Sequence, residues 1–492
     1  MSKTKPILVI FSALALSFLF FGVGTAFACC GGGGVWQMFH QNWHHSGYTS
    51  CPLPSSPQLI WQYNIGVGFS TPVYDTDAAH TYATLFIASN SSYVYAYNDN
   101  THFLRWSKNL GTGVKSTPLY DNSSNRLYVG SGTQMYALNK TSGATIYNYT
   151  AGGNIRSSPA TIPGTGNIYF GADDGVVYAL NSTGSAIWKF RTAGPVISSP
   201  AIYENGVVFV GSADNKVYAI NVSTGKQKWA YTTGGDVNST PTTPENQEKV
   251  FVGSADGNVY ALNRSTGALV WNYTTGGPVI SSPAVNKDSG NIYVGSNDNN
   301  VYALNSTGGF RWIYATADDV KASPAVSDGK VLVNSIDGHI YMLSEADGSL
   351  IWDYSSSTPT SSSPIIENYK IYVGTNSKVL VFGSNPVDAT IDIDPDTINL
   401  GSNGKWITAY IEVDGYDLST IDTSAVLLEG VVPATGPSEV GDYDSDGIAD
   451  LMVKFDRQAV SELLSPGEAE LTVTGKVWEV HFKGSDTVDV IG

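Results

Sequence analysis

Residues 279–317 read VISSPAVNKDSGNIYVGSNDNNVYALNSTGGFRWIYATA. Four short segments of this stretch are rich in Val, Ile, Tyr and Trp, and Gly, Asn, Asp and Ser divide them, which predicts four strands joined by tight turns. The first strand contains Ser-Ser-Pro, and because Pro cannot donate to a ladder we expect that strand at an edge of its sheet. The fourth contains Trp312, a large apolar surface suited to contact with a neighbouring sheet.

The same pattern recurs along most of the chain. Eight Pro residues follow one another at steps of 40 to 46 residues: Pro72, Pro118, Pro159, Pro200, Pro241, Pro283, Pro324 and Pro364. An aromatic residue precedes each by 11 or 12 positions: Trp61, Trp106, Tyr147, Trp188, Trp229, Trp271, Trp312 and Trp352. A period near 40 with four strands per unit is typical of a β-propeller. We therefore predict an all-β chain with an eight-bladed propeller over residues 57–383.

The two ends of the repeat region indicate how the ring closes. The last third-type strand is Val379 to Phe382, and no Trp-containing strand follows it. One such strand, Leu59 to Asn64, instead precedes the first Ser-Thr-Pro. We predict that these two segments pair, because closure removes the open edges of the sheets.

The repeat, which reads VYVGS-x-D-G-x-VYALN-x-x-TG-x-x-x-W-x-Y, resembles the PQQ-like, or quinoprotein-type, propeller repeat. The segment WQMFHQNWHHSGY at residues 36–48, within a lead-in over 29–56, resembles the lead-in of secreted PQQ-like repeat proteins. His40, His44 and His45, with Cys51 nearby, could bind Zn²⁺. The resemblance implies instead that His40 and His45 pack the lead-in against the ring.

A compositional change marks a second domain. Residues 384–388 read as a linker, and the alternating runs beyond it predict a small β-sandwich over 389–492. Residues 386–492 hold 21 acidic and 5 basic side chains, a charge of −16, whereas the chain as a whole has −17. The domain resembles a C-terminal module of archaeal and bacterial surface proteins. Nothing in the chain resembles a basic nucleic-acid footprint, so we expect no nucleic-acid partner.

The acidic domain contains one motif with metal-ligand spacing, GDYDSDGIAD. Asp442, Asp444, Asp446 and Asp450 stand at positions 1, 3, 5 and 9 of an EF-hand-like loop, and the Ile448 carbonyl stands at position 7. Val453 replaces the bidentate Glu of position 12, which predicts weak binding, on the order of 10⁻⁴–10⁻³ M. We predict a structural Ca²⁺ site, and the alternative is an acidic, solvated turn.

The N-terminus predicts export. Residues 1–28 combine Lys3 and Lys5 with a long apolar run and a small-residue cleavage site, which is typical of a signal peptide, although an uncleaved anchor is the alternative. Cys29 could then carry a lipid, and Cys30 could pair with Cys51. Ten sequons indicate an exported glycoprotein, while turn chemistry also explains their recurrence: Asn90, Asn122, Asn139, Asn148, Asn181, Asn221, Asn238, Asn263, Asn272 and Asn305.

These features predict a non-catalytic binding or scaffold protein, secreted or at the cell surface, with a protein or glycan ligand and membrane contact only through the N-terminus. The alternatives are a PQQ-dependent dehydrogenase and an envelope assembly-factor lipoprotein with a propeller. The resemblance to quinoproteins implies that a PQQ enzyme has long loops over the quinone and an adjacent-Cys disulfide inside the propeller. The turns here are short and the adjacent pair Cys29-Cys30 lies at the signal junction, so we expect neither PQQ nor enzyme activity. Recurrence gives a structural turn role to four acidic residues: Asp214, Asp256, Asp298 and Asp337.

Overall fold

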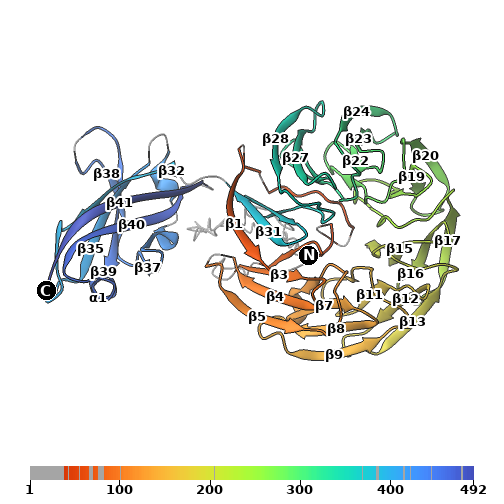
Figure 1. The fold of residues 1–492 in the computed structure, drawn as a ribbon, viewed down its shortest axis with the longest axis horizontal. Helices are drawn as coiled ribbons and strands as arrows, with labels where there is room; N and C mark the ends of the chain where they lie inside the picture. Colours follow the sequence, from red (N-terminus) through yellow and green to blue (C-terminus); the bar gives the residue numbers. More distant parts are fainter. Residues whose placement is uncertain are drawn as a thin grey trace, which may run out of the picture.

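The computed structural model describes residues 38–492, apart from residues 41, 43, 52, 55, 66–69, 76–82, 100, 204–205, 368, 384–386, 414–415, 422, 445 and 478–479. Figure 1 shows a ring of sheets and, beside it, a smaller body formed by the C-terminal residues. The predicted signal peptide, Cys29, Cys30 and the first three linker residues lie outside the described residues. Strands make up nearly all of the regular structure, so the all-β prediction is confirmed.

The ring consists of antiparallel sheets, one for each sequence repeat, in which consecutive strands pair; the exception is β1, which pairs with β31. The inner strands are β2 (Val73–Asp75), β6 (Leu119–Asp121), β10 (Ala160–Thr161), β14 (Ala201–Tyr203), β21 (Ala284–Val285), β25 (Ala325–Ser327) and β29 (Ile365–Glu367). The second strands are β3 (Thr84–Ala88), β7 (Arg126–Ser131), β11 (Ile168–Gly171), β15 (Val207–Ser212), β18 (Lys249–Gly253), β22 (Ile292–Gly295), β26 (Lys330–Asn334) and β30 (Lys370–Gly374). In the sheet of β18, a bridge between Thr242 and Phe251 takes the place of the inner strand.

The remaining two positions complete each sheet. The third strands are β4 (Tyr93–Asn98), β8 (Gln134–Asn139), β12 (Val176–Leu180), β16 (Lys216–Asn221), β19 (Asn258–Asn263), β23 (Asn300–Leu304), β27 (His339–Ser344) and β31 (Lys378–Gly383). The outer strands are β5 (Leu104–Asn109), β9 (Thr145–Thr150), β13 (Ala186–Arg191), β17 (Gln227–Thr232), β20 (Leu269–Thr274), β24 (Phe310–Ala315), β28 (Leu350–Ser355) and β1 (Gln58–Asn64). Second strands such as β15 are buried throughout, whereas β17 buries only Trp229 and half-buries Tyr231.

The outer-strand Trp of each sheet docks on the next sheet. Trp188 Nε1 donates to the Val222 carbonyl at 2.7 Å, and its ring covers Gly225, where an added Cβ would come within 2.7 Å of the indole. Trp106, Trp229, Trp271 and Trp312 donate to the equivalent carbonyls of Lys140, Arg264, Ser306 and Glu345. Tyr147 occupies the same place against Gly184. Glycine at this turn therefore permits the aromatic contact between sheets.

A belt of hydroxyl groups joins the inner strands around the ring axis. The backbone N–H of one Ser or Thr in each Ser-Ser/Thr-Pro element donates to the matching hydroxyl of the next sheet, at 2.9–3.0 Å, along the series Thr117, Ser158, Ser199, Thr240, Ser282, Ser323 and Ser363. These hydroxyls satisfy backbone donors that a short inner strand would otherwise leave unpaired. Ser and Thr are thus small enough for the crowded region near the axis, and their hydroxyls accept this hydrogen bond.

The ring closes through β1, which pairs with β31 from Gln58↔Gly383 to Asn64↔Lys378, as the sequence predicts. The seam between the last and first sheets also contains a buried ion pair, because Lys370 Nζ lies 2.8 Å from the fully buried Asp99. Tyr372 donates to the same carboxylate oxygen at 2.7 Å. Burial acts to raise the pKa of Asp99, but the Lys370 charge and these hydrogen bonds outweigh it and lower the pKa.

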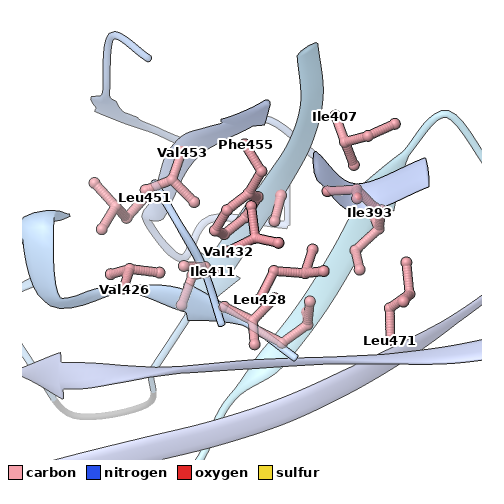
Figure 2. Close-up of a cluster of buried hydrophobic side chains, with 14 of the residues drawn as sticks. Ile393, Ile407, Ile411, Val426, Leu428, Val432, Leu451, Val453, Phe455 and Leu471 are labelled. Carbon is pink, nitrogen blue, oxygen red and sulfur yellow. The ribbon is translucent and has the colours of Figure 1, made fainter. Parts of the chain in front are cut away.

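The C-terminal residues form two sheets around a separate core. The first contains β32 (Val387–Asp388), β34 (Thr397–Asn399), β36 (Leu427–Leu428), β37 (Val432–Pro433), β40 (Gly467–Val477) and β41 (Val480–Ile491). The second contains β33 (Thr390–Asp394), β35 (Trp406–Glu412), β38 (Glu439–Gly441) and β39 (Asp450–Asp456). Figure 2 shows Ile393, Ile407, Leu428, Val453 and Phe455 meeting in this core, where all five are fully buried.

Short helices complete the described elements. The α-helix α1 (Arg457–Ser461) begins after Asp456, whose carboxylate caps it by accepting the Ala459 N–H at 3.0 Å. The 3₁₀ helices are η1 (Asn122–Ser124), η2 (Leu418–Thr420) and η3 (Thr423–Ala425).

Candidate functional site

The chain path gives the ring two different ends. Each inner strand begins at the loop from the preceding outer strand and finishes at the turn to its own second strand. The N–H of Ala193, in such a loop, donates to Asp214 in the β15–β16 turn at 2.8 Å, so these loops and the turns from second to third strands lie together. We call this the loop end of the ring. The opposite end, with the turns from inner to second strands, is the turn end.

The lead-in segment lies against the inner strands on the turn-end side. Backbone hydrogen bonds of 2.8–3.0 Å join it to three sheets, from Thr243 to the His44 carbonyl, from Val285 to Ser46 and from Val326 to Gly47. Tyr48 donates to Asp288, which follows the inner strand β21, at 2.7 Å. The chain's own N-terminal segment therefore occupies the inner surface at this end.

Two histidines hold the lead-in across the ring. His40 Nε2 lies 2.9 Å from the Pro324 carbonyl, and His45 Nε2 lies 2.9 Å from the Pro200 carbonyl. Burial lowers the pKa of His40 to about 4 and that of His45 to about 3. Both rings are consequently neutral at pH 7 and donate Nε2–H to a carbonyl. These contacts match the packing role that the resemblance implies rather than a Zn²⁺ site.

Cys51 is buried beside the inner strand β25 and forms a disulfide. Ser327 donates to the Cys51 carbonyl, which ties this part of the lead-in to the ring. The other two cysteines of the chain, Cys29 and Cys30, lie outside the described residues. The predicted Cys30–Cys51 pairing therefore stays a prediction.

The recurrent turn aspartates have the structural role that their recurrence predicts. Asp214 accepts the Tyr218 hydroxyl at 2.7 Å and also the N–H of Ala193 in the preceding loop. Each Asp thus clasps its own third strand to the neighbouring sheet. The same clasp recurs at Asp256, Asp298 and Asp337.

Three cationic side chains stand at the loop end, each shortly before an inner strand. Lys115, Arg156 and Lys321 each stand two residues before a member of the hydroxyl belt, so they occupy equivalent positions in three sheets; the belt residues are Thr117, Ser158 and Ser323. Arg156 is bound to Asp173 at 2.7 Å and Lys321 to Asp319 at 2.9 Å. Lys115 is exposed and forms no ion pair within the described part of the chain. Of these three cations, Lys115 is therefore the one left without a carboxylate partner among the described residues.

The predicted Ca²⁺ loop brings only some of its residues together. Carboxylate oxygens of Asp442, Asp444 and Asp450 all lie within 4.8 Å of one another. Asp446 is not in that group, and its carboxylate accepts the Ile448 N–H at 2.7 Å. Gly447 adopts φ +95°, a conformation that glycine enters readily. The loop thus has three convergent carboxylates, while the predicted Asp446 and Ile448 ligands are not shown to join them.

Sequence reasoning missed further carboxylates beside this loop. Asp392, Asp394 and Asp396 line, with Asp444 and Asp450, a cavity of about 250 Å³. Burial, followed by the negative charges of Asp486 and the neighbouring aspartates, raises the pKa of Asp392. The alternating Asp residues of IDIDPD were the available signal, since alternate residues of a strand share one face.

Comparisons with known proteins agree with this fold. Residues 70–306 match the family model described as the β-propeller of beta-alanine-activating enzyme, and residues 276–387 match the model described as outer membrane protein assembly factor BamB. No curated protein matches by sequence.

Several solved structures share the fold. A europium-containing methanol dehydrogenase aligns with TM-score 0.62 and 13% identity, over 72% of this chain and 99% of that one. BamB from Moraxella catarrhalis aligns with TM-score 0.56 and 17% identity, over 67% and 98%. Quinohemoprotein alcohol dehydrogenase from Comamonas testosteroni aligns with TM-score 0.59 and 13% identity, over 72% and 81%.

The ring of this chain is therefore a PQQ-like β-propeller, as the repeat predicts. Within that class, the structural neighbours include both dehydrogenases and an assembly factor. The prediction that the chain is not an enzyme is contradicted by these neighbours, and the argument against PQQ has no support from them. That prediction relied on short turns and on the position of a cysteine pair, whereas dehydrogenases align with this ring over 72% of the chain.

Proposed function

We propose that this chain is an exported binding or scaffold protein that takes its ligand on the loop end of its propeller. The difference between the two ends supports this proposal. The lead-in segment occupies the inner surface at the turn end, whereas the loop end carries Lys115 without an ion-pair partner among the described residues, together with the paired Arg156 and Lys321. Loops held by a rigid scaffold commonly carry recognition. A protein or glycan of the cell envelope is the partner that we expect.

The test is retention of an envelope component by the immobilised full-length chain. We compare the unmodified chain with Lys115→Glu, at the loop end, and with Lys228→Glu on the exposed outer strand β17. Both changes reverse one exposed charge, so they differ only in position. We expect Lys115→Glu to lose the retained component and Lys228→Glu to keep it. Equal retention by the two variants would contradict the proposal.

A second candidate function is PQQ-dependent oxidation of an alcohol. The three cationic side chains at the loop end favour it, because PQQ carries three carboxylates. Lys115 is free to bind one of them, while Arg156 and Lys321 would have to share their charge with Asp173 and Asp319. Bound PQQ would supply a quinone that takes up two electrons. The protein's own contribution would be to bind and orient the cofactor through these cationic side chains.

Titration with PQQ separates the two functions. Stoichiometric binding of PQQ, followed by dye-linked oxidation of an alcohol in the presence of Ca²⁺, would establish the oxidoreductase. Saturating PQQ without binding or dye reduction would leave the binding function alone. Lys115→Gln should weaken PQQ binding if the cofactor uses the loop end.

We also propose that the C-terminal domain binds Ca²⁺ in a structural role. Asp442, Asp444 and Asp450 converge, and oxygen ligands of this kind suit Ca²⁺. Their mutual repulsion in the absence of a cation would disfavour the compact loop. A bound ion would therefore stabilise the domain.

Export to the cell surface is part of the same proposal. Its support is the predicted signal peptide and the sequons, and glycosylation of those sequons stays a prediction. Within the described residues, no helix is both long and apolar enough to cross a bilayer. N-terminal sequencing of the native protein should find a chain that begins at Cys29. Recovery of an intact Met1 form from the soluble extracellular fraction would contradict cleavage.

A further inference from the structure

Three neighbouring sheets lack the aspartate clasp of the others. At the turn between second and third strands, the sheet of β30 and β31 has Thr375 and Asn376, the sheet of β3 and β4 has Asn90 and Ser91, and the sheet of β7 and β8 has Gly132. In the other sheets an Asp at this turn binds its own Tyr and, in four of them, the preceding loop as well. The loop end is therefore built differently on this side of the ring.

A polar cavity lies where the clasp is missing. It measures about 200 Å³, and its lining includes Ser70, Asn90, Lys115, Ser361 and Asn376. These residues come from the last, first and second sheets, so the cavity spans the seam where the ring closes. Among the described residues, none that lines this cavity is acidic.

Four side chains around this cavity have no partner within the described structure. They are the Lys115 ammonium, the amides of Asn90 and Asn376, and the Ser361 hydroxyl, and all four residues are exposed. The equivalent cations elsewhere in the ring differ, because Arg156 and Lys321 are held by Asp173 and Asp319. Lys115 thus retains the full capacity of an ammonium to bind an anion.

We propose that this seam pocket binds a small hydroxy acid of the sugar-acid type. Its carboxylate would pair with Lys115 Nζ, and the amides of Asn90 and Asn376 and the Ser361 hydroxyl would hydrogen-bond its hydroxyl groups. This use of Asn90 requires that its sequon carries no glycan. A ligand with both groups satisfies every uncommitted side chain, which acetate or glucose alone would not. This inference rests on the proposed function, since it specifies the ligand class of the same end of the ring.

The test is isothermal titration of the full-length chain with D-glucuronate, D-glucose and acetate. Affinities typical of drug-sized ligands, scaled to a ligand of this size, predict a Kd on the order of 1 mM for glucuronate. We expect glucose and acetate to bind at least tenfold more weakly. Lys115→Gln should weaken glucuronate binding by about tenfold, because it removes a charge-assisted hydrogen bond. The matched control Lys228→Gln should leave the affinity unchanged.

Two results would overturn the inference. One is the absence of saturable glucuronate binding, and the other is equal affinity in Lys115→Gln and the unmodified chain. If either result is found while the unmodified chain still retains an envelope component and Lys115→Glu does not, only the proposed ligand class is refuted. Glucuronate binding without any such retention would instead refute the proposed function in the envelope and leave the pocket assignment intact.

Discussion

Removing Asp99 should destabilise the propeller more than any exposed charge change. Asp99 is fully buried at the seam, and Lys370 Nζ lies 2.8 Å from its carboxylate while Tyr372 donates to it at 2.7 Å. Asp99→Ala leaves the Lys370 ammonium without its partner in a largely buried position. Breaking one side of such a pair costs about 3–5 kcal/mol. For a ring of this length, a loss of about 4 kcal/mol lowers the Tm by about 6 °C.

The assay is calorimetry of the full-length chain, following the transition of the propeller. Asp328→Asn is the control, because Asp328 forms a short ion pair with Lys330 but its side chain is 51% exposed, and Asn tolerates the φ of +50° at this position. An exposed pair of this kind contributes at most about 1 kcal/mol, so the control should shift the Tm by less than about 2 °C. Tyr372→Phe, which removes one hydrogen bond and keeps the ion pair, should fall between the two. Equal shifts for Asp99→Ala and Asp328→Asn would refute the idea that this pair stabilises the seam.

Three further predictions concern other parts of the molecule. Trp229→Ala should lower the free energy of unfolding, measured by denaturant titration, by about 3–5 kcal/mol. The substitution leaves a cavity where the indole is buried and removes the hydrogen bond to the Arg264 carbonyl. A loss below about 1 kcal/mol would contradict the docking role of Trp229. The pKa of His40 is about 4 and that of His45 about 3, below the ordinary 6.5, so the folded state binds fewer protons than the unfolded state. The free energy of unfolding should therefore fall as the pH drops from about 6.5 towards 4. Substitution of both histidines by Gln should flatten this pH dependence, and an unchanged pH dependence would refute the assignment. For a Kd near 1 mM, Ca²⁺ at about 10 mM should raise the Tm of the C-terminal domain by about 5 °C. Asp444→Ala should abolish this shift. A mutant whose Tm responds to Ca²⁺ like that of the unmodified chain would show that the loop is a solvated turn and not the Ca²⁺ site.

The sequence was informative wherever the repeat determines structure. The period of the Ser-Ser-Pro element predicted the sheets, and the surplus strand at Leu59 predicted the pairing of β1 with β31. Recurrence also identified the role of turn aspartates such as Asp214, because a contact between neighbouring sheets must repeat with the sheets. Features that repeat with the sheets can be predicted because the same short motif marks each of them in the sequence.

The features that depart from the repeat could not be predicted. At the seam, His102 stands where other sheets have glycine, adopts φ +59° and stacks on Trp61 with 4.1 Å between ring centroids. The pair of Asp99 and Lys370 joins residues 271 positions apart, a separation that no local pattern reveals. The seam pocket likewise arises from an absence of turn aspartates in three sheets, and its meaning depends on which sheets are neighbours in space.

The binding role of the loop end is tested most directly by site-specific photo-crosslinking in cells of the source organism. A photoreactive amino acid replaces Lys115 at the loop end, Asn238 at the equivalent position of another sheet, or Lys228 on the outer wall. The account predicts a crosslinked envelope component from positions 115 and 238 and none from position 228. Crosslinks from position 228 alone, or equal crosslinks from all three positions, would contradict it.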